Sequence, residues 1–353
     1  MNTLVKPGSR ARLAFAGLQS ARVAFYGAHY LLARLMAGET VQARTRRTHP
    51  LPSSTELMAA ITALFAEDWR NVEEGLYPPA LDWRQELGLA LKSVRYLSDV
   101  PKVIERQQRN RHRDVDPGQV QLPDYYRRNF HFQTDGYLSE RSAGLYDFQV
   151  EALFGGTAGA MRRRAFVPIA RYQKRRGAGP HVLLDVGAGT GAFLSFVQKV
   201  CPAIEAVALD LSEPYLAHAQ RRAARLGQST RFLVGPVEAI PLPDASVDIV
   251  SSIYLFHELP PEVRAQAARE IARVLKPGGL FVLADSLQYR DVPSFDGLLE
   301  LFPGLLHEPF YASYARSDLK PLFAPEGLLP VHVDIAYLTK IIAFEKLSGG
   351  QAR

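Results

Sequence analysis

The sequence predicts an α/β fold built on a doubly wound parallel sheet. A glycine-rich turn, a well-spaced acidic residue and alternating apolar runs predict it. The segment 181–193 leads from four apolar positions into a glycine turn that opens a helix. Asp210 follows nineteen residues after the last glycine of that turn and closes the next apolar run. Such glycines let the backbone approach a nucleotide-type cofactor, and a carboxylate at the end of the second strand binds ribose hydroxyls.

Apolar runs and chain breakers place the remaining elements of the C-terminal half. Strands are predicted near 181–186, 205–210, 230–235, 248–253 and 279–285, with helices near 190–200, 213–227 and 260–275. Two final runs, 329–338 and 339–346, touch without room for a helix, which predicts an antiparallel pair. In open α/β sheets, ligands bind at the carboxyl ends of the strands. Those ends carry residues 187–191, Asp210, 236–238, 254–258 and 285–288.

The N-terminal arm, residues 1–50, concentrates the positive charge. It holds eight Lys and Arg against the single acid Glu39, so its net charge is +7. The whole chain has a net charge of +6, and the remaining residues therefore sum to −1. The C-terminal half therefore offers no basic groove, and nucleic acid is not expected as a partner.

On a helical wheel this arm is amphipathic. The predicted apolar side consists of Leu13, Phe25, Ala28, Leu31, Leu32 and Leu35, and the polar side of Arg12, Gln19, Arg22, His29 and Arg34. Phe15 and Val23 depart from the pattern. Three interpretations stay open. The arm is a helix packed on the protein or on a partner subunit, as in a homodimer; a helix on an anionic membrane surface; or an organellar transit peptide.

Breakers divide the rest of the chain into a helical region over 51–122, an aromatic-rich segment over 123–180, called the lid below, and a sheet domain over 181–347. In the helical region, Ser54 or Thr55 is expected to cap a helix that ends at Gly75. A second helix is expected over 81–97, and the polar stretch 106–121 predicts an exposed linker.

The glycine turn alone fits two cofactor classes. Gly187, Gly189 and Ala192 match a dinucleotide fingerprint, whereas Asp185 with Gly187, Gly189 and Gly191 matches the turn that binds S-adenosylmethionine. The blocks PLPDASVD at 241–248 and LKPGG at 275–279 favour the second class. With these blocks, the stretch from Tyr126 to Leu347 resembles the class I S-adenosylmethionine-dependent methyltransferases, in the branch similar to ubiquinone/menaquinone methyltransferases.

The resemblance implies a Rossmann-like, seven-stranded methyltransferase sheet with an antiparallel C-terminal strand, and S-adenosylmethionine as the cofactor. The cofactor-binding residues it implies are Asp185, Gly187, Ala188, Gly189, Gly191, Asp210, Leu211, Val237, Glu238, Tyr254 and, in the lid, Tyr146. Relatives commonly carry an acidic residue where this chain has Pro236. Adenine would then be held by the Val237 backbone and apolar neighbours, or by Glu238.

Methyl transfer needs alignment, exclusion of water and a base when the acceptor carries a proton. The candidate catalytic residues are His257 and Glu258 after the fourth strand, and His131 in the lid. An orienting role for His257 is the alternative. The aromatic-rich lid and the segment after the fifth strand suggest substrate contacts from Tyr126, Phe132, Asp135, Tyr137 and Tyr311.

Composition is that of a globular enzyme with no disulfide framework, because Cys201 is the single cysteine. No Cys/His/Asp cluster has ligand spacing, so no metal is expected. No apolar run is long enough to span a bilayer, and a cytoplasmic enzyme, peripheral at a membrane if the arm binds lipid, is expected. The expected acceptor is a small aromatic or lipophilic molecule methylated on O, C or S. A small thiol or other compact metabolite, and a non-catalytic cofactor-binding scaffold, are the alternatives.

Overall fold

The computed structural model describes residues 8–37, 47–82, 87–88, 91–109, 111, 113, 115, 122–177 and 179–348. The first half of the chain is helical. Its elements are α1 (Ser9–Ala37), α2 (Ser54–Glu73), α4 (Ser93–Gln108), the short helix η2 (Phe130–Phe132), α5 (Glu140–Leu153) and α6 (Ala158–Arg176). The second half alternates strands and helices. It contains β1 (Val182–Val186), α7 (Ala192–Val200), β2 (Glu205–Asp210), α8 (Glu213–Arg225), β3 (Thr230–Val234), β4 (Val247–Ile253), η3 (Phe256–Glu258), α9 (Pro261–Val274), β5 (Leu275–Ser286), η4 (Pro293–Phe295), α10 (Asp296–Leu306), α11 (Tyr311–Arg316), α12 (Lys320–Phe323), η5 (Ala324–Glu326), β6 (Leu328–Ala336) and β7 (Thr339–Lys346).

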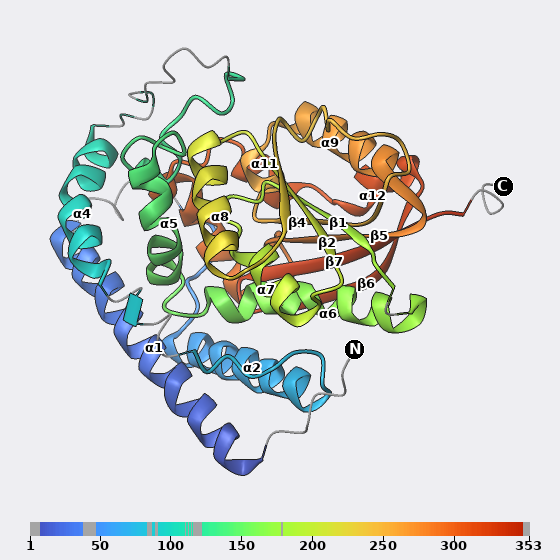
Figure 1. The fold of residues 1–353 in the computed structure, drawn as a ribbon. Helices are drawn as coiled ribbons and strands as arrows, with labels where there is room; N and C mark the ends of the chain where they lie inside the picture. The colour runs from blue at the N-terminus through green and yellow to red at the C-terminus, as the bar shows by residue number, and fades with distance from the viewer. Residues whose placement is uncertain are drawn as a thin grey trace.

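The seven strands form one sheet in the order β3-β2-β1-β4-β5-β7-β6. The first five strands are parallel, and β7 runs antiparallel to both β5 and β6. The predicted α/β sheet with an antiparallel end is therefore confirmed. The central strands read as near-continuous apolar runs because helices cover both of their faces. Figure 1 shows α6 and α7 on one side of the sheet and α9 and α12 on the other.

Alternate residues of each strand supply two separate cores. Leu183 packs with α6 and α7, whereas its neighbour Leu184 packs with α9 on the opposite face. Phe281 and Phe344, on the antiparallel pair β5 and β7, stack with ring centroids 5.7 Å apart in the α9 core. The two-sided burial holds the carboxyl ends of β1, β2, β4 and β5 at one edge.

The N-terminal helices pack around the sheet domain (Figure 1). Helix α2 begins with a capping box in which the Ser53 side chain and Glu56 satisfy each other's backbone N–H groups. Its buried Asp68 accepts hydrogen bonds from Arg163 of α6 at 2.6 Å and from the Tyr77 hydroxyl at 2.7 Å. The predicted helix is confirmed, but its cap is Ser53 and not Ser54 or Thr55, and it ends at Glu73.

The predicted apolar side of the arm does not pack on the rest of the protein. In α1 the residues Phe15, Gln19 and Tyr26 are buried, whereas Leu13 and Leu35 are 74% and 70% exposed. The side that packs is therefore set by the rings of Phe15 and Tyr26 and not by the leucines. Phe15 lies 5.3 Å from the Trp69 ring of α2, and Tyr26 packs on Phe148 of α5.

The second helix predicted in the helical region is also wrong in extent. Residues 81 and 82 are not helical, and α4 begins at Ser93 and continues to Gln108. Its buried contacts come from Asp99 and Val100, beyond the predicted end at 97. Residues 110, 112, 114 and 116–121 of the predicted linker, like 1–7 and 38–46 of the arm, lie outside the described residues.

We predict that Phe15→Ala loosens α1 from the rest of the protein, because it removes a buried ring that anchors the helix. We expect a loss of about 3–5 kcal/mol in the free energy of unfolding of the α1–α2 unit. The matched control Leu13→Ala should change it by less than about 0.5 kcal/mol. Urea denaturation combined with amide hydrogen exchange of α1 measures both. Equal effects of the two substitutions would contradict this packing.

Candidate functional site

The glycine turn after β1 forms the floor of the site. Gly187, Gly189 and Gly191 have φ values of 69°, 53° and 70°, a left-handed backbone that favours glycine. A Cβ on Gly187 would meet Leu255 at 3.1 Å, and one on Gly191 would meet Ala219 at 2.9 Å. A Cβ on Gly189 would meet nothing closer than 4.0 Å. The turn is therefore packed at its ends and open in its middle, where a ligand can approach the backbone.

Asp210, at the end of β2, is held in place by that turn. Its Oδ2 accepts a hydrogen bond from the Gly189 N–H, and its Oδ1 accepts one from the Ser212 N–H, both at 2.8 Å. Burial raises the pKa of Asp210 above its ordinary value, and the two backbone N–H groups oppose the rise. The carboxylate lies on the wall of a pocket, where it can accept hydrogen bonds from a ribose diol.

Asp185 lies beneath the turn and does not line the pocket. Its side chain accepts a hydrogen bond from the Ser251 hydroxyl of β4 at 2.7 Å. Burial raises its pKa to about 7. Among the described contacts, Asp185 joins β1 to β4 directly below the glycines and so supports the shape of the turn.

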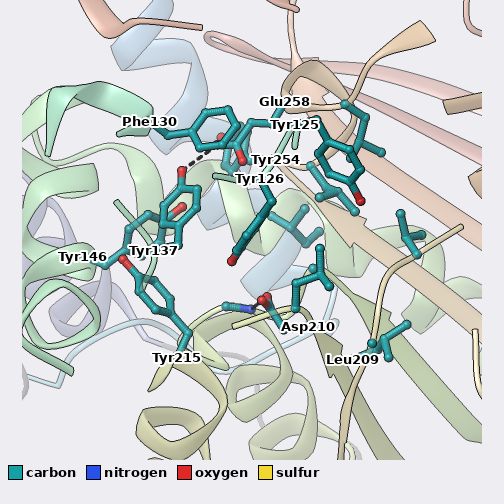
Figure 2. Close-up of a pocket in the computed structure, with 18 residues that line it drawn as sticks. Tyr125, Tyr126, Phe130, Tyr137, Tyr146, Leu209, Asp210, Tyr215, Tyr254 and Glu258 are labelled. Atoms are coloured by element: carbon teal, nitrogen blue, oxygen red, sulfur yellow. Dashed lines mark hydrogen bonds between the residues drawn. The ribbon is translucent and has the colours of Figure 1, made fainter. Parts of the chain in front are cut away.

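Tyrosines from the lid cover the strand ends. Figure 2 shows the pocket enclosed between the lid and the ends of β1, β2 and β4. The pocket is lined by Tyr125, Tyr126, Phe130, Tyr137, Tyr146, Gly187, Gly189, Leu209, Asp210, Leu211, Tyr215, Gly235, Val237, Ile253, Tyr254, Leu255, Glu258 and Leu259. The ring of Tyr126 lies above Asp210 (Figure 2). Six tyrosines and a phenylalanine thus make this an aromatic pocket with two acidic side chains.

Buried hydrogen bonds attach the lid to the sheet domain. The Tyr137 hydroxyl donates to Glu258 at 2.6 Å, and the Ser212 hydroxyl donates to the Tyr137 carbonyl at 2.6 Å. Asp147 of α5 accepts from the Thr190 hydroxyl at 2.8 Å and pairs with Arg222 of α8. Burial opposes ionisation of Asp147, but Arg222 holds its pKa well below the usual range.

One end of the pocket fits adenine. Val237 lines it, and the neighbouring Glu238 accepts a hydrogen bond from the Tyr125 hydroxyl at 2.7 Å through Oε1. Its Oε2 is buried with no hydrogen-bond partner among the described residues. An exocyclic amine would satisfy that oxygen. The residues present therefore fit S-adenosylmethionine, with Asp210 for the ribose and Glu238 or the Val237 backbone for the adenine.

The opposite end is a buried acid–base cluster. Asp285, at the end of β5, accepts hydrogen bonds from the Phe256 and His257 N–H groups and pairs with His257 Nδ1 at 2.5 Å. Tyr254, just before the short helix η3, lies on the pocket wall. Its backbone has a left-handed φ of 57°, which is disfavoured for a residue other than glycine. The bend after β4 directs the Glu258 carboxylate toward the pocket (Figure 2).

The cluster shifts the protonation of its members. Burial raises the pKa of Glu258 to about 7, while the His257 and His131 imidazoles act to lower it. Burial lowers the pKa of His257, but the Asp285 and Glu308 carboxylates outweigh burial and raise it to about 10. A carboxylate with a pKa of about 7 at a pocket wall matches the requirement for a general base at neutral pH.

The structure brings most of the predicted site residues together. Those on the pocket wall are Gly187, Gly189, Asp210, Leu211, Val237, Tyr254, Glu258, Tyr126, Tyr137 and Tyr146. Those that do not line it are Asp185, Ala188, Gly191, Glu238, His131, His257 and Tyr311. Tyr311 is buried, accepts or donates a hydrogen bond with the Ser286 hydroxyl, and lies beside the His257 ring.

Two predicted substrate residues have other placements. Asp135 has a left-handed φ of 65° and does not line the pocket. The Phe132 backbone belongs to η2, and its side chain lies outside what the structure describes.

Sequence reasoning missed several residues of the pocket. Tyr125 and Phe130 belong to the same aromatic run as the predicted lid residues, so that run was the available signal. Tyr215 lies in the first turn of α8, and no local pattern marked it. Glu308, 4% exposed, contacts both His131 and His257. From its neighbourhood only Tyr311 was predicted, as a substrate contact.

Within the described residues, no group of three or more His, Cys, Asp and Glu side chains is arranged to hold a metal ion. Across the same part of the chain, no helix combines the length and apolarity that crossing a membrane requires.

Known methyltransferases resemble part of this chain. A family model described as "Methyltransferase domain" matches residues 183–279. A demethylmenaquinone methyltransferase from Thermus thermophilus is 31% identical over 196 residues, covering 53% of this chain and 84% of that protein. A ubiquinone/menaquinone biosynthesis C-methyltransferase from Methylobacterium nodulans is 33% identical, covering 45% of this chain and 62% of that protein. A malonyl-[acyl-carrier protein] O-methyltransferase from Methylococcus capsulatus is 39% identical over 34% of this chain and 42% of its own length.

We predict that Glu258→Gln stabilises the protein at about pH 8. The folded-state pKa of Glu258 is raised to about 7 from 4.5, so the folded state binds the proton more tightly than the unfolded state. The contribution of Glu258 to the free energy of unfolding is complete below its pKa in the unfolded state. It is lost as the pH rises through its folded-state pKa of about 7. Glutamine removes that loss, and we expect a gain of roughly 1–3 kcal/mol at about pH 8 that vanishes near pH 4.

Thermal unfolding of both proteins across that pH range measures the difference. The exposed Glu205→Gln serves as the matched control and should give a difference independent of pH. A Glu258→Gln difference that stays constant with pH would contradict the raised pKa.

Proposed function

The chain belongs to the class I S-adenosylmethionine-dependent methyltransferases, and we propose that it methylates a small aromatic or lipophilic acceptor whose proton passes to Glu258. It is an enzyme of that family, and S-adenosylmethionine is its cofactor. The observation that carries the proposal is the position of Glu258. This buried carboxylate lies on the same aromatic pocket as the glycine turn and Asp210. The pocket therefore combines cofactor contacts with a base.

When bound, S-adenosylmethionine would supply an electrophilic methyl carbon for in-line attack by an acceptor, with S-adenosylhomocysteine as the leaving group. The protein's residues align the two reactants and exclude water. Asp210 and the Gly187–Gly191 backbone would hold the cofactor at the sheet edge, and the lid tyrosines exclude water above it. Glu258 takes the acceptor's proton, and the Tyr137 hydroxyl stabilises the ionised carboxylate by donating to it.

The aromatic lining supports an acceptor with an apolar or aromatic body. Tyr137 stacks on Phe130 at 5.5 Å, with Tyr146 and Tyr215 edge-on to neighbouring rings. A planar ring fits against such a wall through offset or edge-to-face contacts. The similar proteins include a ubiquinone/menaquinone biosynthesis C-methyltransferase and a malonyl-[acyl-carrier protein] O-methyltransferase. A carbon or oxygen acceptor with an acidic proton is therefore our proposal, in preference to a thiol.

The outer face of α1 supports a place of action at an anionic membrane surface. Leu13, Leu31 and Leu35 are exposed there, with 74%, 55% and 70% of their surface accessible. Arg10 and Arg34 are exposed on the same helix, which contains no Asp or Glu. A second copy packed on this face would bring arginine against arginine, whereas anionic lipid complements both the apolar side chains and the charge. We therefore propose lipid, and not a homodimer, as the occupant.

We predict that the methyltransferase reaction fails in Glu258→Gln with acceptors that must lose a proton. Transfer of a radiolabelled methyl group to a panel of phenols, hydroquinones, carboxylic acids and thiols identifies the acceptor class. With the best acceptor, the rate should fall by about 10²–10⁴-fold in Glu258→Gln. Glu205→Gln, an exposed change on β2, should retain the full rate. Unchanged transfer by Glu258→Gln, or a preference for thiols, would contradict the proposal.

We predict that the protein sediments with vesicles containing phosphatidylglycerol and less with pure phosphatidylcholine vesicles. Leu31→Ser with Leu35→Ser should weaken vesicle binding by at least roughly tenfold, because two exposed leucines lose their apolar contact. Added salt should weaken binding of the unaltered protein. Leu226→Ser, which alters a leucine 58% exposed on the far side of α8, should bind as the wild type does. A dimer in sedimentation velocity that the double substitution dissociates would favour the homodimer instead.

A further inference from the structure

Glu308 lies behind Glu258, away from the pocket wall, at the junction of the lid and the sheet domain. Its side chain is 4% exposed. Its Oε1 is 2.9 Å from Nε2 of His131 in the lid, and its Oε2 is 3.4 Å from Nε2 of His257 at the end of β4. One buried carboxylate therefore contacts imidazoles from two different parts of the fold.

The same two imidazoles also face the pocket carboxylate. Nε2 of His131 and Nε2 of His257 are each 3.9 Å from Oε1 of Glu258. The imidazoles thus lie between Glu308 behind and Glu258 in front. Neither His131 Nε2 nor Glu308 Oε2 has a well-aligned hydrogen-bond partner among the described residues. The contact of His131 with Glu308 at 2.9 Å is the shortest of these imidazole–carboxylate contacts, and the others join the cluster through charge attraction at 3.4 to 3.9 Å.

The backbone at this junction is held in a disfavoured conformation. His131 has φ of 55° inside η2, and His307, next to Glu308, has φ of 47° at the end of α10. Residues other than glycine adopt this left-handed region only when the surroundings enforce it, and such residues cluster at functional sites. The contact with Glu308 is the interaction that the structure offers for holding the His131 side chain inward.

We infer that Glu308 is a positioning residue of the methyl-transfer site, tying His131 of the lid to His257 of the sheet domain behind Glu258. This inference rests on the proposed role of Glu258 as the base. Glu308 does not line the pocket, so it acts through the imidazoles and not on the acceptor. Its negative charge favours the protonated form of both imidazoles, together with Asp285 at His257, and its contacts with both rings join the lid to the strand end.

The charges around the cluster agree with that role. Glu308 faces His131 from η2, His257 and Glu258 from η3, Tyr311 from α11 and the adjacent His307. Asp285 lies on the far side of His257. Burial lowers the pKa of His131, but Glu308 and Glu258 outweigh burial and raise it. Burial likewise raises the pKa of Glu308, and the two imidazoles lower it below its usual value.

Nitrogen NMR of the full-length protein labelled with ¹⁵N-histidine tests the inference without an acceptor. Spectra of His131→Gln and His257→Gln assign the two rings. In the unaltered protein the His257 ring should remain doubly protonated at neutral pH, and His131 should titrate above the ordinary value of histidine. In Glu308→Gln the midpoint of His131 should move to lower pH by roughly one unit or more, since an opposite charge within contact distance is lost. In Glu308→Asp the titration midpoint of His131 should lie between those of the unaltered protein and Glu308→Gln. The exposed Glu205→Gln should leave this midpoint unchanged.

The outcomes are separable. A His131 midpoint unchanged in Glu308→Gln, with the thermal midpoint of unfolding showing a folded protein, overturns the inference. Resonances of both rings that shift on adding zinc and return with a chelator would also overturn it, because the cluster would then be a metal site. A shifted midpoint together with normal methyl transfer in Glu258→Gln would instead leave the positioning of the imidazoles standing and reject the proposed function.

Discussion

The site depends on one buried carboxylate, Asp285 at the end of β5. It accepts the Phe256 and His257 N–H groups, the Ser286 N–H and the His257 ring. A carboxylate with 1% of its side chain exposed is stable only when its oxygens are satisfied in this way. These bonds fix the bend after β4 and so aim Glu258 at the pocket. The antiparallel strand β7 pairs along β5 as far as Ser286 and keeps that strand end in place.

From this fixed point, charge pairs extend to the lid. His257 contacts Glu308, Glu308 contacts His131, and Glu258 accepts the Tyr137 hydroxyl. On the cofactor side, Asp147 and Arg222 make the second connection. A buried charge without its partner is costly, so each pair favours the closed arrangement of lid and sheet. The aromatic wall is thereby positioned by polar contacts at its two ends.

The sheet and the cofactor turn were predictable because their signals are local. These short-range patterns are apolar runs buried on both faces, three glycines in one turn, and an acid at the end of the next strand. In the structure the Asp210 carboxylate accepts a hydrogen bond from the Gly189 N–H, as the spacing predicts. Glu308 escaped because its partners are distant in sequence, and Tyr215 because its role depends on the fold of the lid. The side of α1 that packs could not be predicted from the helical wheel, because the buried residues Phe15, Gln19 and Tyr26 are not those of the apolar side, whose leucines are exposed.

The most direct test is calorimetric titration with S-adenosylhomocysteine, for the wild type, Asp210→Ala and the exposed Asp244→Ala, with NADH as a second ligand. The account predicts tight binding of S-adenosylhomocysteine and none of NADH. It also predicts a loss of roughly tenfold to a hundredfold in Asp210→Ala, as expected for charge-assisted hydrogen bonds to the ribose, and normal binding in Asp244→Ala. Binding of NADH, or S-adenosylhomocysteine binding that is unaffected by Asp210→Ala, would contradict the assignment of the glycine turn and Asp210 as the cofactor site.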